Sequence, residues 1–334
     1  MQWHVTERCN LRCEHCYQDD YSGKELEFSE LLCVLDQFKN LVNTWRANGK
    51  GVPVRSHITV SGGEPFIRKD FPKLLEIFSA NRQNFSFAIL TNGTLIDASV
   101  AKLLGKLNPG FVQVSIEGGR TVHDKIRGRG TFDLAVSAIK YLVRERIRTF
   151  ISFTVCRSNY TGFPEAARLG RRLKVSRVWA DRLIPHGSGA ALKDQVMTKQ
   201  DTHDFFKIML NERDKAARSW FGKTEIAMHR ALQFLVAGGR PYHCTAGDTL
   251  ITVQPDGDLY PCRRMPIRVG NLMESTLSEL YYESELFQEL RNIDRIDAKC
   301  RECFYSKLCR GGLKCLSYAL TGDPFKADPG CWHK

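Results

Sequence analysis

The chain has 334 residues, of which 43% are hydrophobic and 26% charged, and its formal charge is +12. This composition is that of an ordinary globular protein, and no apolar run approaches the roughly 20 residues that span a bilayer. No secretory signal begins the chain, so we predict a cytoplasmic protein whose twelve cysteines serve metal binding rather than disulfides. The basic residues accompany no nucleic-acid motif, so we expect neither nucleic acid nor membrane as partner. They indicate an acidic substrate or only a solvated surface.

Short β-branched runs alternate with longer amphipathic segments over residues 1 to about 185. Helices are predicted at Ser29–Asn43 and Thr131–Arg144, among others, and Ser29 and Asp97 are the expected N-caps. The alternation predicts an α/β fold, a partial (β/α)6 TIM-like barrel with ligands at the carboxyl ends of its strands. The predicted strands are Gln2–Thr6, His57–Val60, Phe85–Leu90, Phe111–Ile116, Phe150–Val155 and Arg177–Leu183.

The predicted elements change from about residue 240, where long helical patterns are replaced by short ones. Helical periodicity at 198–218 and around Glu225–Val236 bridges the two parts. A hairpin is predicted from TLITV to LYPC, with Asp256-Gly257 at its turn. We therefore divide the chain into a barrel domain, 1–220, and a segment 221–334 with a bridging helix and a small cysteine-rich domain.

Three cysteines follow the first predicted strand, in the array Cys9-x3-Cys13-x2-Cys16. Structural zinc normally takes four closed ligands, which three thiols do not supply. Iron–sulfur cubanes take thiolates, usually four. A cubane held by three would leave one iron with an open position, as catalysis at a metal requires. The array predicts a catalytic [4Fe–4S] cluster, and a structural zinc or cluster site is the alternative.

The array, followed by the aromatic Tyr17, resembles the motif of the radical S-adenosylmethionine enzymes. In that family the open iron is chelated by the amino and carboxylate groups of S-adenosylmethionine (SAM). One electron from the cluster cleaves SAM, and the resulting 5′-deoxyadenosyl radical abstracts hydrogen from the substrate. The resemblance covers roughly residues 2–190 and implies an external electron donor of the flavodoxin or ferredoxin type. His15, inside the array, is expected to pack beside the cofactor.

Further motifs that resemble this family stand at the ends of later predicted strands. In TVSGGEP, the family likeness implies that Glu64 holds the methionine amino group of SAM. The segment RLIPHGSG is expected to supply backbone contacts to adenine. Each of these is alternatively an ordinary turn or loop. The cofactor-binding residues implied by the resemblance are Tyr17, Gly62, Gly63, Glu64, Pro65, Asn92, Ser115, Glu117, Arg127, Ser152 and Asn159.

The C-terminal cysteines resemble the SPASM extension, which carries two auxiliary iron–sulfur clusters in that family. By this resemblance, an outer cluster is held by Cys300, Cys303, Cys309 and Cys331, and an inner cluster by Cys244, Cys262 and Cys315. With the first cluster, this implies three [4Fe–4S] clusters. Between Cys309 and Cys315 stand five residues, RGGLK, where the family has three, and this insertion is expected to bulge. A zinc ribbon is the alternative for the paired cysteines.

The inner cluster then lacks a fourth thiolate, which His243, Asp248, water or a substrate group would replace.

Two cysteines remain outside all three arrays. Cys33 lies in the apolar stripe LLCVLDQF and is expected in the core. Cys156 ends the fifth predicted strand, where it is either a buried packing residue or the catalytic hydrogen-atom donor that a peptide epimerase needs.

The resemblance to SPASM enzymes implies a peptide substrate for most members and a tetrapyrrole for others. Sulfatase-activating members carry an acidic residue directly after the cysteine of the Gly-x4-Cys motif, where this chain has Arg263 followed by Arg264. This difference argues against sulfatase maturation. The guanidinium pair indicates an anionic group on a peptide or small-molecule substrate, and a surface pair answering nearby acidic residues is the alternative.

We therefore expect a maturase that crosslinks, forms a thioether in, or epimerises a ribosomal peptide. A decarboxylase-type tetrapyrrole enzyme is the first alternative, and an electron-transfer scaffold without catalysis is an alternative of another class. The first predicted strand begins almost at Met1, whereas many peptide-modifying relatives begin with a leader-binding domain. We expect a leader peptide to be recognised by a separate protein, by the basic surface, or not at all.

Overall fold

The computed structural model describes residues 1–48, 55–218 and 224–333. The strands are β1 (Gln2–His4), β2 (His57–Ser61), β3 (Ser86–Thr91), β4 (Phe111–Ser115), β5 (Thr149–Val155), β6 (Arg177–Arg182), β7 (Glu225–Ala227), β8 (Thr252–Val253), β9 (Asp258–Tyr260) and β10 (Gly270–Asn271). The barrel helices are α1 (Phe28–Asn48), α2 (Phe71–Ala80), α3 (Ala98–Leu107), α4 (Arg120–Arg127), α5 (Thr131–Arg144), α6 (Phe163–Arg172) and α7 (Lys199–Ala217). Later helices are α8 (Phe234–Ala237), α9 (Leu277–Glu283), α10 (Glu285–Arg291), α11 (Ala298–Arg301), α12 (Ser306–Cys309) and α13 (Lys314–Thr321).

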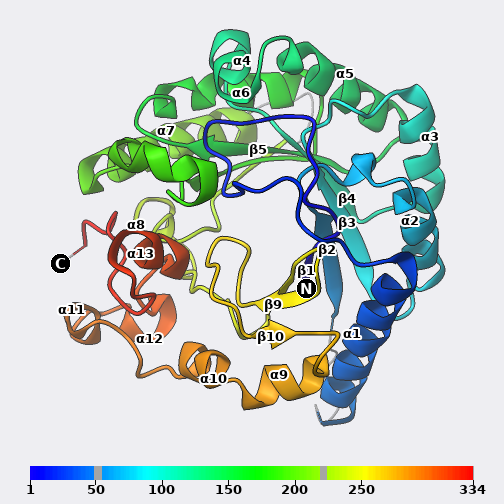
Figure 1. The fold of residues 1–334 in the computed structure, drawn as a ribbon. Helices are drawn as coiled ribbons and strands as arrows, with labels where there is room; N and C mark the ends of the chain where they lie inside the picture. Colours follow the sequence, from blue (N-terminus) through cyan, green and yellow to red (C-terminus); the bar gives the residue numbers. More distant parts are fainter. Residues whose placement is uncertain (49–54, 219–223, 334) are drawn as a thin grey trace.

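The ten strands form one sheet in the order β10-β9-β8-β1-β2-β3-β4-β5-β6-β7. All neighbours from β8 to β7 pair in parallel, whereas β8, β9 and β10 are antiparallel. A helix follows each of β1 to β6, which confirms the predicted partial barrel of six β/α units. Figure 1 shows the barrel helices in an arc outside the sheet, and the C-terminal segment (orange to red) across its open side.

Local sequence explains several element boundaries. The predicted N-cap Asp97 accepts a hydrogen bond from the backbone N–H of Val100, 2.8 Å away, and starts α3. The predicted helix Thr131–Arg144 is α5 with the same bounds. Strand β3 is buried from Phe87 to Thr91, as expected for a parallel strand covered on both faces.

Three predictions about the fold were wrong. Periodicity indicated a helix around Glu225–Val236, but the segment begins with β7, because Ile226 pairs beside Val178 of β6 and is buried there. Ser29 is not an N-cap, since α1 already begins at Phe28. Cys33 is exposed rather than in the core, because neighbouring apolar residues of α1 form the buried face.

The predicted hairpin is present as β8 and β9, with Gly257 at its turn in a left-handed conformation (φ 91°). Since β8 pairs with β1 in parallel, the hairpin extends the barrel sheet and brings the C-terminal segment to its open edge. The division at residue 220 stays a prediction. None of the helices in the described segments is long and apolar enough to cross a bilayer.

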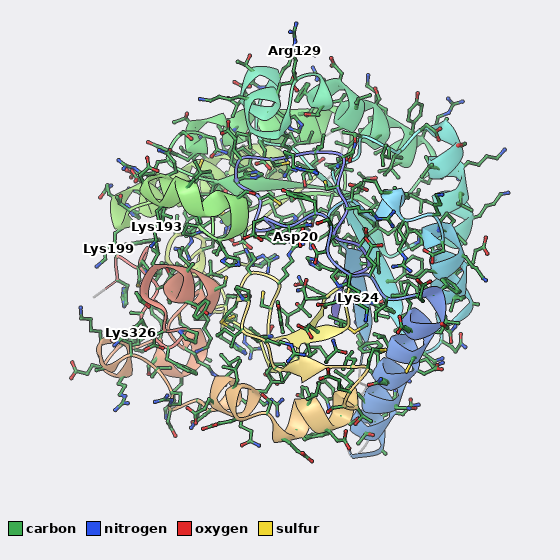
Figure 2. The ribbon with its side chains drawn as sticks, in the orientation of Figure 1. Asp20, Lys24, Arg129, Lys193, Lys199 and Lys326 are labelled. Atoms are coloured by element: carbon green, nitrogen blue, oxygen red, sulfur yellow. The ribbon has the colours of Figure 1, made fainter. Side chains whose placement is uncertain are left out.

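The excess basic charge is spread over the surface. Exposed Arg129 and Lys326 project outward from different sides of the molecule in Figure 2, and Lys193 and Lys199 are likewise exposed. This distribution matches the solvated-surface interpretation of most basic residues. The exposed basic residues therefore indicate no binding site, and any binding role of positive charge would belong to particular buried arginines.

Candidate active site

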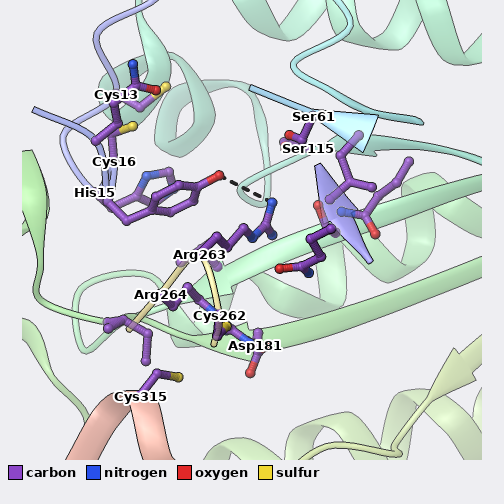
Figure 3. Close-up of a pocket in the computed structure, with 18 of the residues that line it drawn as sticks. Cys13, His15, Cys16, Ser61, Ser115, Asp181, Cys262, Arg263, Arg264 and Cys315 are labelled. Atoms are coloured by element: carbon purple, nitrogen blue, oxygen red, sulfur yellow. Dashed lines mark hydrogen bonds and ion pairs between the residues drawn. The ribbon is translucent and has the colours of Figure 1, made fainter. Parts of the chain in front are cut away.

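A cavity lies at the carboxyl ends of the parallel strands and reaches the C-terminal cysteines (Figure 3). Ser61, Thr91 and Asp181 contribute from β2, β3 and β6. The predicted site residues that line it are Cys9, Cys13, Cys16, Tyr17, Gly62, Gly63, Asn92, Ser115, Arg127, Ser152, Cys244, Cys262 and Cys315. The fold thus brings the first array and the three inner cysteines to one cavity.

The three-cysteine loop is held by its backbone. The Cys16 N–H donates to the Cys13 carbonyl at 3.1 Å, and the Cys16 carbonyl accepts from Gly189 N–H at 2.7 Å. Gly189 belongs to the segment expected to contact adenine, so part of that backbone is already used on the loop. Gly187 has φ 58°, and a Cβ there would lie 2.3 Å from the Tyr17 carbonyl carbon. This close approach requires glycine and fixes the loop against the barrel.

Burial raises the pKa of the Cys9 thiol to about 11 and also raises that of Cys13, although the Arg127 guanidinium partly opposes the shift at Cys13. A metal would have to displace these protons, because the thiolate is the ligand form. The described residues contain no group of three His, Cys, Asp or Glu side chains placed to hold one metal ion. A cubane does not require such a group, because each thiolate binds a different iron.

The two glycines of the second-strand motif allow two loops to touch. Gly63 N–H donates to the Thr6 carbonyl at 2.8 Å, and a Cβ on Gly63 would lie 2.4 Å from the Arg8 carbonyl oxygen. A side chain at this position would push the cysteine loop away from β2. Both Gly62 and Gly63 also line the cavity, so their backbone is accessible to a ligand.

Glu64 is completely buried behind this motif. Its carboxylate accepts from the Thr91 hydroxyl and from the Asn92 backbone N–H, each at 2.8 Å. Burial raises the pKa of Glu64 to about 7, against these hydrogen bonds. A neighbouring ammonium group would stabilise the charged form. Glu64 does not itself line the cavity, so its contact with the amino group stays a prediction. Pro65 does not line the cavity but begins a short 3-10 helix, Pro65–Ile67.

Glu117 does not face the cavity as predicted. Its carboxylate accepts from Arg127 Nη2 at 2.6 Å and from the backbone N–H of Thr154 at 2.8 Å, and it contacts His15 Nε2 at 3.0 Å. Burial alone would raise the pKa of Glu117, but Arg127 and His15 lower it to about 2. Glu117 therefore orients His15 and Arg127, which do line the cavity.

Asn159 and Cys156 also lie outside the cavity lining. The Asn159 side chain accepts from the Cys156 N–H at 2.8 Å and donates to the Thr154 carbonyl at 2.9 Å, so it closes the end of β5 instead of facing a ribose. The Cys156 thiol is buried and lies 3.2 Å from the Ser158 hydroxyl. This position fits the packing alternative, and the role of hydrogen-atom donor stays a prediction.

The outer cysteines form a second site. Cys300, Cys303, Cys309 and Cys331 together line a cavity of about 370 Å³. The insertion between Cys309 and Cys315 bulges as predicted, because Arg310, Gly311 and Gly312 successively adopt φ values of 52°, 86° and 81°. The four thiols are thereby gathered as the predicted outer set requires.

Cys244, Cys262 and Cys315 all line the main cavity. Figure 3 shows Cys262 and Cys315 across the cavity from Cys13 and Cys16. Neither of the side chains proposed to complete this set, His243 and Asp248, lines the cavity. The three inner thiols therefore face the main cavity without either of these side chains. Burial raises the pKa of Cys315, although Arg264 acts against that shift.

Several lining residues escaped the sequence analysis. Asp181 accepts from Arg264 Nη1 at 2.6 Å, and Arg230 lies 3.8 Å from the same oxygen. The Arg230 guanidinium also stacks over Trp179, 4.4 Å from the ring centroid. Trp179 and Asp181 stand two residues apart in β6, so they point to the same face of the strand. This spacing was the sequence signal that could have identified them as lining residues.

Comparison with known proteins agrees with this geometry. The model of the radical SAM superfamily matches residues 3–169, and that of the SPASM iron–sulfur cluster-binding domain matches residues 244–304. The chain is 29% identical to mycofactocin maturase MftC of Mycolicibacterium smegmatis, over 99% of this chain and 82% of that protein. It is 26% identical to Fe-coproporphyrin III synthase of Methanosarcina barkeri, over 99% and 86% of the two chains.

Solved structures share the fold. The structure of native anSMEcpe with bound AdoMet has a TM-score of 0.77 at 20% identity, covering 99% of this chain and 93% of that one. Streptococcus suis SuiB bound to the precursor peptide SuiA has a TM-score of 0.73 at 17% identity, covering 99% and 75%. Because the superfamily match spans half of the chain and includes both the thiol array and the glycine pair, this chain belongs to the radical SAM superfamily and is an enzyme of its SPASM-containing group.

Proposed function

We propose that this enzyme modifies a carboxylate-bearing ribosomal peptide by hydrogen abstraction inside the main cavity. The observation that carries the proposal is that Cys9, Cys13 and Cys16 share one cavity with the inner thiols and with Arg263. A substrate in this space would lie between the two sets of thiols. A crosslink, a thioether and an epimerised residue are all products of this reaction class.

The family binds SAM and a [4Fe–4S] cluster, which when bound supply one-electron cleavage and a strong hydrogen-atom acceptor. Cys9, Cys13 and Cys16 would hold this cluster. Glu64 would accept from the methionine ammonium group, and its orientation is fixed by Thr91. Ser115 and Ser152 line the cavity and are proposed to contact the rest of the cofactor.

Two auxiliary [4Fe–4S] clusters belong to the same proposal. The inner one would be held by Cys244, Cys262 and Cys315, and the outer one by the four cysteines of the second cavity. An outer cluster close to the surface is a natural entry point for electrons from a flavodoxin or ferredoxin type donor. A separate leader-binding protein and a cytoplasmic, oxygen-poor setting remain part of the proposal.

A tetrapyrrole substrate is a second candidate. The similarity to a coproporphyrin synthase over nearly the whole chain favours it, and Arg263 suits its carboxylate side chains as well as it suits a peptide. Sulfatase maturation is disfavoured because a guanidinium, not a carboxylate base, follows Cys262. Likeness of fold to anSMEcpe does not offset that difference in chemistry.

The experiment is anaerobic reconstitution followed by assay of 5′-deoxyadenosine with strong reductant. Candidate peptides encoded by adjacent reading frames are compared with coproporphyrin III, each deuterated at the position to be attacked. Transfer of deuterium into 5′-deoxyadenosine from one substrate supports that candidate. Transfer from the porphyrin alone would replace the peptide proposal, and no SAM cleavage in any arm would overturn the reaction class.

A further inference from the structure

The structure assigns the binding of a substrate carboxylate to Arg263, assisted by the Tyr17 hydroxyl, and gives Arg264 a different role. This inference rests on the proposed function and names the feature that would select the substrate. The two adjacent arginines, which the sequence presents as a pair, lie in unequal environments.

Both arginines stand at the tip of one tight turn after β9. Cys262 and Met265 form an antiparallel bridge, and Met265 N–H donates to the Cys262 carbonyl at 2.9 Å. Arg263 and Arg264 are the two central residues of this turn, so both side chains leave it at the cavity wall. Figure 3 shows them diverging, Arg263 toward the cysteine loop and Arg264 toward Asp181.

Arg264 is already neutralised. Its Nη1 lies 2.6 Å from the Asp181 carboxylate, and the two side chains are only 17% and 12% exposed. Burial would raise the pKa of Asp181, but Arg264 and Arg230 keep it below its ordinary value. Its charge is thus committed to Asp181.

Arg263 has no such counterion among the described residues, where its guanidinium makes one side-chain hydrogen bond, from Nη1 to the Tyr17 hydroxyl at 3.3 Å. Its Nε is buried without an acceptor. A partly buried guanidinium with unused donors is poorly satisfied, and a carboxylate is the group whose paired oxygens match its geometry. Since Arg263 lines the cavity, its guanidinium is available to a ligand there.

Tyr17 completes the site. The phenol of a tyrosine is neutral near pH 7. Its oxygen accepts from Arg263, and its own O–H remains free to donate to a carboxylate. The neighbouring His4 is also neutral, because burial and Arg263 lower its pKa to about 3. The guanidinium therefore carries the local positive charge beside the cysteine loop.

The competing explanation is that Arg263 balances the negative charge of a cluster. Arg263 lies on Tyr17, with its guanidinium carbon 5.2 Å from the ring centroid, whereas Arg264 is paired with Asp181. The geometry therefore separates the two arginines: Arg264 is bound to a protein carboxylate, and Arg263 is left for the ligand. The substrate atoms nearest the carboxylate would lie beside the SAM end of the cavity.

The test measures ligand binding to the reconstituted wild type, Arg263→Gln and Arg263→Lys, by quenching of tryptophan fluorescence, since Trp179 lines the cavity. One arm pairs coproporphyrin III with its tetramethyl ester. The other arm pairs peptides from adjacent reading frames with forms whose carboxylates are amidated. Arg268→Gln is the matched control, because Arg268 lies on the same hairpin, is 52% exposed and is paired with Asp258 outside the cavity.

In at least one arm, wild type should prefer the acid by about 10- to 100-fold, the range expected for hydrogen bonds to a charged group. Arg263→Gln should lose that preference, Arg263→Lys should recover part of it, and Arg268→Gln should keep it. Equal binding of acid and neutral forms by wild type in both arms, or an unchanged preference in Arg263→Gln, would overturn the assignment. An unchanged preference with a shifted auxiliary-cluster potential would support the charge-balancing role instead.

Cleavage of SAM without substrate is measured on the same samples. We expect Arg268→Gln to retain it, because Arg268 is paired with Asp258 outside the cavity. Absence of cleavage in wild type would count against the proposed function, whereas the comparison of acid with neutral ligands judges the role of Arg263 independently.

Discussion

The two ends of the main cavity are built in different ways. At the barrel end, Ser115 and Ser152 occupy neighbouring register positions of β4 and β5, and the sheet fixes their places without any cofactor. At and beyond the other end, Cys315 of the main cavity and Cys300 and Cys309 of the outer cavity stand on helices of eight, four and four residues. Helices this short have little stability of their own. The comparison teaches that the radical-generating end is organised by the fold, whereas the C-terminal end depends on a few anchors and on bound metal.

The main anchor is a buried ion pair. Arg182, at the end of β6, donates to both carboxylate oxygens of Asp328, at 2.7 and 2.5 Å. Asp328 also accepts from the Leu313 N–H at 2.9 Å. Arg182 lines the main cavity and Asp328 lines the outer-cysteine cavity. One pair of side chains thus joins the barrel to both cysteine sites.

The largest effect is expected from the loss of one cysteine of the first array, which affects only the barrel end of the cavity. Cys13→Ala should abolish SAM cleavage, because two thiolates would remain for the first cluster, while circular dichroism should show an unchanged barrel. Cys303→Ala should still cleave SAM but without coupling to substrate, because it removes only an outer thiol. Assay of 5′-deoxyadenosine checks both variants. Persistent cleavage in Cys13→Ala would contradict the assignment of the first cluster.

The second largest effect is expected from breaking the buried ion pair between Arg182 and Asp328. Arg182→Ala leaves the Asp328 carboxylate buried and unpaired, so it should lower the free energy of unfolding by about 3–5 kcal/mol. Urea unfolding measures the loss, and limited proteolysis should cut the C-terminal segment first. The control is Arg120→Ala, which removes an exposed pair with Asp133 and should not shift the midpoint measurably. Equal behaviour of the two variants would show that the anchor has no special role.

Glu64 gives a pH dependence at the barrel end. Its pKa of about 7 lies above the ordinary 4.5, so the cofactor-free protein should lose stability as pH rises from about 4.5 to 7. An ammonium ligand prefers the ionised carboxylate. SAM affinity should therefore weaken by roughly tenfold per pH unit below 7. In Glu64→Gln, calorimetric titration should find weaker and nearly pH-independent binding, and a wild-type slope in that variant would contradict this role.

The smallest expected effect separates the two components of the carboxylate site. Tyr17→Phe removes one hydroxyl and leaves Arg263 in place, so binding of the acidic ligand should weaken by roughly threefold, the cost of one neutral hydrogen bond. The same fluorescence titration measures it. A loss as large as that of Arg263→Gln would mean that Tyr17 positions the guanidinium rather than assisting it.

Sequence reasoning predicted best where one chemical rule decides the structure. The thiol array, the glycine pair and α5 follow from local spacing, and the structure places them accordingly. It failed where a tertiary contact overrides a local pattern. Strand β7 is only three residues long, and Glu117 is turned inward by Arg127, which lies ten residues further along the chain.

The substrate side of the cavity was the least predictable part. The sequence presents Arg263 and Arg264 as equivalent neighbours, and only the pairing of Arg264 with Asp181 separates them. Asp181 stands 83 residues before Arg264, so no local pattern joins the two. The same holds for Arg182 and Asp328, which lie 146 residues apart in the sequence. Long-range ion pairs of this kind carry no periodic signal.

The most direct test of the two-ended account is the iron content of the anaerobically reconstituted protein, measured with acid-labile sulfide. Three cubanes predict about twelve irons per chain for the wild type. Triple replacement of Cys9, Cys13 and Cys16 by Ala should leave about eight, because the C-terminal clusters are held independently of the barrel end. About four irons in the wild type and none in the triple variant, or zinc in place of iron, would contradict the account.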